Sequence, residues 1–174
     1  MHILPAADLG IMAQHLSAHK GIIRKLNIYQ RMVQSSELKK IISQQANAMQ
    51  GHVHIMLAFI DPAFHDPIEV PPLYVFEEKG YENWQSGNAG ENDQWIALET
   101  HSTAKQMAGN NFSSALMMQD LAVRNAHVEM ALQQTELLRR YEAFLEETGW
   151  MYVPQSDIRS QQDTYRHFYQ AFYS

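Results

Sequence analysis

Apolar residues recur at alternating spacings of three and four between Leu9 and Phe59, in two runs separated by the polar turn Gln34-Ser35-Ser36. The first run is Leu9, Met12, Leu16, His19, Ile23, Leu26, Gln30 and Val33, and the second is Leu38, Ile41, Gln45, Ala48, His52, Ile55 and Phe59. This period marks one face of an α-helix. Two such helices joined by a short turn lie antiparallel. Counted from the turn, His19 and His52 lie at nearly the same height.

The ends of these two helices are marked in the sequence. Pro5 suits the start of the first helix, because its fixed φ is favourable there and its missing N–H is not needed. Ser35 and Ser36 are good N-caps for the second helix. Pro62 ends that helix, because proline disfavours a helical residue before it and donates no amide hydrogen. The sequence therefore predicts a helical hairpin over residues 6–61.

Residues 62–92 have a different character. They hold four of the six prolines, together with many large apolar residues: Val70, Leu73, Tyr74, Val75, Phe76, Tyr81 and Trp84. Such a composition is too apolar for a freely solvated tether, so we predict an ordered crossover that packs along the helices. Connections of this length are uncommon inside compact domains. A long crossover does join the second and third helices of ferritin-like bundles.

A second helical hairpin is predicted over residues 93–149. Asp93 is placed to cap a helix from Gln94 to about Met118, and Asp120 is placed to cap the next helix. Gly149 suits a left-handed C-cap at the end of that helix. The apolar faces are assigned to Ala97, Ala104, Ala108, Phe112, Ala115, Leu116 and Met117 in the first helix, and to Leu121, Val128, Leu132, Leu138, Tyr141 and Leu145 in the second.

The two hairpins suggest an internal duplication. Leu16-Ser-Ala-His-Lys20 can be laid over His101-Ser-Thr-Ala-Lys105, and the entry Ser36-Glu-Leu38 over Gln119-Asp-Leu121. Two hairpins are what a four-helix bundle needs. The predicted fold of residues 1–174 is a single all-α domain: a ferritin-like up-down four-helix bundle, with a long Pro-rich crossover between helices 2 and 3 and a short aromatic C-terminal helix over residues 157–173.

Composition and charge narrow the class of protein. A net charge of −6 argues against nucleic-acid binding, which needs clustered Lys and Arg. There are no cysteines, which excludes disulfides and thiol nucleophiles. No apolar run approaches the length of a membrane span, and no signal peptide is apparent. We therefore expect a soluble cytoplasmic protein without a membrane partner.

The segment from Ala126 to Pro154, AHVEMALQQTELLRRYEAFLEETGWMYVP, resembles the end of the spore coat protein F family, with Gly149-Trp150 followed by Pro154 as the most specific piece. HLSAHKGIIRKLNIYQ in the first helix and the Ser-Ser-Glu-Leu entry to the second are similar to the opening helices of that family. The resemblance implies a ferritin-like fold in an endospore-forming bacterium. It also implies a structural role in or near the spore coat, with other coat proteins as partners and no enzyme activity.

The signatures of the common catalytic sites are missing. Di-iron carboxylate bundles use Glu-x-x-His pairs, but no Glu or Asp stands three residues before any of the nine histidines. The only acid in the first helix is Asp8, at its very start. No serine lies in a G-x-S-x-G elbow. The sequence therefore predicts a protein that is not an enzyme and has no catalytic residues and no cofactor.

Histidines offer a different chemistry. His15 and His19 share a helix face, His52 lies across the hairpin from His19, and Glu136 is expected near the same layer. His101 begins the matching stretch of the third helix. A transition metal such as zinc accepts two or three imidazoles with a carboxylate. The alternative is that His19 and His52 are neutral core groups, bonded to each other, to Gln45 or to a buried water. Both interpretations stay open.

The C-terminal helix carries aromatic residues at spacings of three and four: Tyr165, Phe168, Tyr169, Phe172 and Tyr173. One interpretation is a helix that closes one end of the bundle. The other is an exposed aromatic face that mediates self-association, as in a homodimer, or binds a partner protein, since Tyr and Phe are enriched at interface cores.

Overall fold

The chain is all-α in a computed structural model, which describes residues 3–77 and 89–173. The elements are α1 (Ala6–Met32), α2 (Ser36–Ile60), the 3₁₀ turn η1 (Leu73–Phe76), α3 (Asp93–Met117), α4 (Leu121–Glu147) and α5 (Ile158–Tyr173). The all-α prediction is confirmed, with no strand among the described residues. None of the described helices is both long and apolar enough to cross a membrane.

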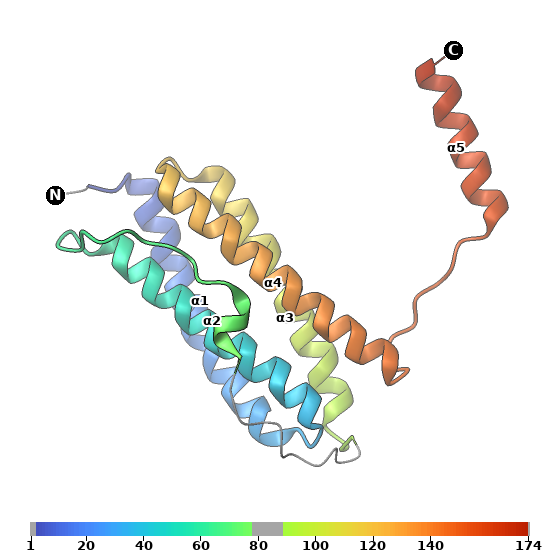
Figure 1. The fold of residues 1–174 in the computed structure, drawn as a ribbon, viewed down its shortest axis with the longest axis horizontal. Coiled ribbons are helices and arrows are strands. Elements are labelled where there is room, and N and C mark those ends of the chain that lie inside the picture. Colours follow the sequence, from blue (N-terminus) through green and yellow to red (C-terminus); the bar gives the residue numbers. More distant parts are fainter. Residues whose placement is uncertain (1–2, 78–88, 174) are drawn as a thin grey trace.

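The helices α1 to α4 form what we call the helical core. α1 and α2 are an antiparallel pair, α3 and α4 are another, and the two pairs pack together mainly through α2 and α4 (Figure 1). The segment after α2 runs back along the core before α3 begins (Figure 1). The predicted Tyr81 and Trp84 of this crossover lie outside the described residues.

Two apolar clusters fill the core at different heights. The first lies towards the α1–α2 turn and includes Leu26, Leu38, Ile42, Met49, Ile96, Leu137 and Tyr141. The second lies towards the α3–α4 turn and includes Met12, Ile55, Met56, Met118, Val123 and Met130. Between them on the four helices come buried polar side chains: His19, His52, Asn111, Ser114, Gln133 and Gln134. A polar layer therefore separates two apolar clusters.

Each turn between paired helices is held by an aspartate of the other pair. The Asp93 carboxylate accepts the backbone N–H of Gln34 (2.9 Å) and of Ser35 (2.7 Å). The Asp8 carboxylate accepts those of Gln119 (2.9 Å) and Asp120 (2.8 Å). Both aspartates are fully buried. The prediction that Asp93 caps its own helix is wrong: the N-cap of α3 is Asn92, and Asp93 bonds the α1–α2 turn instead.

The other predicted helix ends are confirmed. Ser35 caps α2 by accepting the N–H of Leu38, and Asp120 caps α4 by accepting the N–H groups of Ala122 and Val123. α2 ends at Ile60, just before the Asp61-Pro62 pair. Gly149 has φ +70°, a left-handed conformation that L side chains adopt at a cost, and it follows the end of α4.

The two helix pairs are related by a constant sequence offset. α1 ends at Met32 and α3 ends at Met117. α2 begins at Ser36 and α4 begins at Leu121, so the starts of the second helix in the two pairs are separated by the same number of residues as the ends of the first. Asp8 and Asp93 are related by that same offset and hold equivalent turns. The pairing of Leu16–Lys20 with 101–105 keeps this register. The pairing of Ser36 with Gln119 does not, because the structure places Ser35 opposite Asp120 as the helix cap.

The described part of the crossover, residues 62–77, is docked on α2 and α4. Amide side chains of the core donate to its backbone carbonyls: Gln44 to Leu73 (3.1 Å), Asn47 to Phe76 (3.4 Å), and Gln133 to Pro71. Gly51 in α2 leaves room for the Phe76 ring, which a Cβ there would meet at 2.6 Å. The prediction that the crossover packs along the helices is confirmed for these residues.

The predicted apolar faces of α3 and α4 are correct only in part. Ala97, Ala104, Ala115, Tyr141 and Leu145 are buried as predicted, but Phe112, Leu116, Met117, Leu121 and Leu132 are exposed. The buried stripe of α3 includes Ile96, Ala97, Thr100, Thr103, Ala104, Met107 and Asn111, and that of α4 includes Val123, His127, Met130, Gln134, Leu137 and Tyr141. Small and polar residues pack here, so hydrophobicity alone misplaces the face. In α1, Leu9 is exposed as well.

We predict that Asp93→Ala destabilises the helical core by about 2–4 kcal/mol, because the backbone N–H groups of Gln34 and Ser35 lose a charged, buried acceptor. Urea unfolding followed by circular dichroism measures this. Asp93→Asn should cost less, since its amide oxygen still accepts.

Asp157→Ala is the matched control. Asp157 accepts the N–H of Ser160 at the exposed start of α5, away from the core. Its removal should leave the urea midpoint unchanged. Equal midpoints for Asp93→Ala and wild type would show that the interpair caps do not stabilise the fold.

Candidate functional site

Four histidines of three helices meet in and beside the polar layer. His15 and His19 come from α1, His52 from α2 and His127 from α4. The ring centroids are 5.3 Å apart for His15 and His127, 5.8 Å for His19 and His52, and 6.3 Å for His15 and His19. His19, His52 and His127 are fully buried, and His15 is partly buried. We call these four rings the histidine cluster.

Backbone carbonyls fix the tautomer of two of the rings. His19 Nδ1 donates to the backbone oxygen of His15 (2.7 Å), and His127 Nδ1 donates to that of Val123 (2.9 Å). A carbonyl oxygen only accepts, so each Nδ1 carries the hydrogen. The Nε2 atom of each neutral ring then carries a lone pair and can accept a hydrogen bond or bind a metal ion.

A relay through Gln133 orients the third ring. The Gln133 amide Nε2 donates to the backbone oxygen of Pro71, so its Oε1 faces His52. His52 Nε2 donates to that oxygen (2.7 Å), which leaves His52 Nδ1 as the nitrogen that carries the lone pair. The crossover therefore reaches the histidine cluster through one side chain. His15 Nε2 is paired with Ser114 Oγ (2.9 Å) on α3.

The remaining nitrogen of every ring is buried without a hydrogen-bond partner. These atoms are His15 Nδ1, His19 Nε2, His52 Nδ1 and His127 Nε2. Buried polar atoms normally have a partner, and an orphaned one carries a desolvation cost. Four such atoms in one cluster add up to a large desolvation free energy, which a ligand that satisfies them would offset.

All four rings are neutral near pH 7. Burial, with repulsion from His127 and His19, lowers the pKa of His15 from 6.5 to about 4. Burial lowers the pKa of His52 to about 3, despite the hydrogen bond to Gln133 that opposes the shift. The pKa values of His19 and His127 are also lowered by burial. A neutral imidazole is the form that binds a metal ion.

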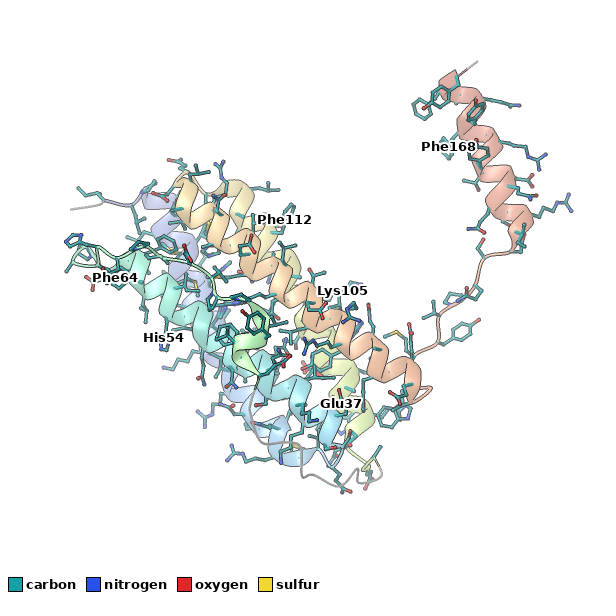
Figure 2. All side chains as sticks on the ribbon, in the orientation of Figure 1. Glu37, His54, Phe64, Lys105, Phe112 and Phe168 are labelled. Atoms are coloured by element: carbon teal, nitrogen blue, oxygen red, sulfur yellow. The ribbon has the colours of Figure 1, made fainter. Side chains whose placement is uncertain are left out.

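The structure brings together three of the four predicted candidates. His15, His19 and His52 lie in the histidine cluster, while the Glu136 carboxylate is bonded to Arg139 and Arg140 (2.8–3.3 Å). Other predicted neighbours are also engaged elsewhere. His101 faces Glu142 (3.4 Å), and Gln45 bonds Gln134 and Tyr141. His54 is exposed on the outer side of α2 (Figure 2).

Sequence reasoning missed His127. The signal is present in the chain, because Val123, His127, Met130 and Gln134 recur at spacings of three and four. The prediction instead places the apolar face of α4 on Leu121, Val128 and Leu132, which sets His127 to one side. The prediction that His19 and His52 lie at the same height is confirmed by their ring separation of 5.8 Å.

The predicted interaction residues all lie on α5. Tyr165, Phe168, Tyr169, Phe172 and Tyr173 are between 51% and 78% exposed. α5 extends away from the helical core (Figure 1), so the interpretation of a helix that closes one end of the bundle is wrong. Trp150 still packs on Phe144, with ring centroids 5.8 Å apart, and the chain is exposed from Tyr152 onwards.

Comparison of the chain with family models, with curated proteins and with solved structures finds no match. The chemistry of its own residues therefore carries the functional argument. Two features stand out from ordinary packing: the buried histidine cluster and the exposed aromatic helix.

Because these histidines are neutral in the folded chain, we expect the free energy of unfolding to decrease at acidic pH. Between pH 6 and pH 4 the unfolded chain takes up protons at histidines whose pKa is 6.5, while His52 in the folded chain, with a pKa of about 3, takes up none. Stability is therefore lost as the pH falls through this range. His52→Gln removes one such group and keeps an amide donor for Gln133. It should reduce the pH slope of the unfolding free energy by up to about 1.4 kcal/mol per pH unit.

Urea unfolding at a series of pH values measures that slope. His54→Gln is the control, because His54 is exposed on the same helix, and its slope should equal that of the wild type. Equal slopes for both variants would contradict the assignment of His52 as a buried neutral ring.

Proposed function

We propose that this chain is a non-enzymatic structural protein that acts through protein–protein contacts and is associated with the spore coat. The resemblance to the spore coat protein F family supports the coat association. We also propose that α1–α4 are a ferritin-like up-down four-helix bundle. The crossover between the two antiparallel pairs and the constant offset that relates them are consistent with it.

The observation that carries the proposal is the exposed aromatic face of α5. This helix of 16 residues has no buried residue. Isolated helices shorter than about 12–15 residues are marginal in water, and most helix stability comes from packing. A helix only just above that length, with five exposed aromatic side chains, therefore needs a surface to cover that face. Tyrosine and phenylalanine are suited to the buried centre of a protein interface.

A second copy of the chain is the partner that we propose. The outside of the α3–α4 pair carries exposed apolar side chains, Phe112, Leu116, Met117, Leu121 and Leu132, and Figure 2 shows Phe112 on that side and Phe168 on α5. The non-helical linker of residues 150–157 is long enough to span roughly 25 Å when extended. One chain thus has both an apolar helix and an apolar surface. A reciprocal exchange of α5 between two copies would bury both.

We predict that Phe168→Ser/Phe172→Ser weakens self-association at least about 30-fold, since a buried aromatic anchor contributes about 2 kcal/mol or more. Sedimentation equilibrium of the full chain over a concentration series measures the dissociation constant. Removal of residues 157–174 should give a monomer. Circular dichroism of each variant shows whether the helical core stays folded.

Asp163→Ser/Gln170→Ser is the matched control on the opposite side of α5. It introduces the same two serines, so it costs similar helix propensity, but it leaves the aromatic face intact. A wild-type chain that stays monomeric at all concentrations, or equal association of both double variants, would contradict the proposed self-association. Direct binding of α5 to a purified coat protein by a monomeric chain would favour a different partner.

A further inference from the structure

We propose that His15, His19, His52 and His127 form a buried binding site for a divalent transition-metal ion of the zinc class. This site lies inside the helical core and is separate from the aromatic face of α5. It goes beyond the proposed structural role, because it assigns a ligand to the core itself.

The spacing of the rings is close to that of a four-imidazole site. Zinc binds imidazole nitrogen at about 2.0–2.1 Å with tetrahedral geometry, which sets neighbouring ring centres roughly 5 Å apart. Along the series His127–His15–His19–His52, the centroids of successive rings are 5.3, 6.3 and 5.8 Å apart. Among the residues that the structure describes, no three His, Asp or Glu side chains are already arranged to hold a metal ion. Binding therefore requires successive rings to close in by about 1 Å or less, and the rings at the two ends of the series, His127 and His52, to converge on the same point.

The hydrogen bonds of the rings resemble the outer shell of a metal site. Metal-binding histidines usually donate the other ring N–H to a carbonyl, carboxylate or water, which fixes the tautomer and the ring orientation. His19 and His127 donate to backbone carbonyls, and His52 donates to Gln133. The other nitrogen of each of these rings is unprotonated, so its lone pair can coordinate a metal ion.

A metal ion satisfies this cluster better than water does. The tautomers of His19, His52 and His127 make at least three of the four orphaned nitrogens unprotonated, so each of these can accept a hydrogen bond but cannot donate one. One water has two O–H donors, so it can pair with only two of them. A single tetrahedral cation accepts electron pairs from all four. A bound cation therefore explains why these buried ring nitrogens have no hydrogen-bond donor beside them.

The ligand set selects the class of metal. All four ligands are neutral imidazoles and the chain has no cysteine. Imidazole suits zinc, copper, nickel and iron, whereas calcium and magnesium require oxygen ligands. Four protein ligands leave no open coordination position, which is typical of a structural site. The buried Asp8 carboxylate acts electrostatically on His127 and supplies compensating negative charge nearby.

The test uses the full-length untagged chain, stripped with a chelator and then titrated with Zn²⁺. We expect one ion per chain, retained on gel filtration, and a melting temperature that rises with Zn²⁺ because the ion binds only the folded core. Co²⁺ is the spectroscopic probe, since tetrahedral Co²⁺ absorbs visible light much more strongly than octahedral Co²⁺. Cu²⁺, Ni²⁺ and Fe²⁺ titrations rank the metals within the class.

Two variants locate the site. His127→Ala should weaken Zn²⁺ binding at least about 10–100-fold, the loss expected even for an outer-shell partner, and should shift the bands of the Co²⁺ spectrum, because a water molecule takes the place of one imidazole. Gln133→Leu should weaken binding by about 10–100-fold and keep the wild-type Co²⁺ spectrum, because it removes only the partner of His52. His54→Ala, an exposed histidine on α2, is the control and should bind as the wild type does.

Wild-type protein that binds none of the five metals stoichiometrically would overturn the site, whether or not the variants fold. So would an octahedral Co²⁺ spectrum, or equal loss of binding in His54→Ala and His127→Ala. Phe168→Ser/Phe172→Ser should bind Zn²⁺ normally, which separates this site from α5.

Discussion

The fold depends on carboxylate-to-backbone hydrogen bonds between the two helix pairs. Asp8 and Asp93 are fully buried, and each holds the turn of the opposite pair. A charged acceptor in a dry site makes a strong bond to an N–H group, and its loss leaves both partners unsatisfied. Because one such bond set lies at each end of the core, the relative height of the two pairs is fixed. The two bond sets therefore also set the relative heights of the residues between the two ends, including those of the histidine cluster.

Much of this fold is predictable from local signals. The turn at Ser35, the stop before Pro62 and the left-handed Gly149 follow from short-range backbone chemistry, and the structure confirms them. The role of Asp93 does not follow, because its partners lie 58 and 59 residues away in the sequence. A carboxylate at a helix start looks like a cap until the tertiary neighbours are known.

The candidate site is only partly predictable, for the same reason. His15, His19 and His52 stand on a hairpin with a clear apolar period, so their meeting can be foreseen. His127 lies on a helix whose buried face contains glutamines and whose exposed face contains Leu121 and Leu132. Hydrophobicity is a poor guide to orientation on such a helix. The constant offset between the two pairs relates His127 to the buried Ile42 of α2, and this equivalence places the histidine on a core face.

The polar layer also has a structural consequence of its own. A slip of α2 by one helical turn would move His52 into an apolar cluster and break its hydrogen bond to Gln133 of α4. A slip of α1 would likewise move His19 into an apolar cluster, although its bond to the His15 carbonyl within the same helix would be kept. Such buried polar groups oppose wrong registers more than they stabilise the right one. A metal ion that binds all four rings would add stability to that selectivity, because the ligands converge in one register only.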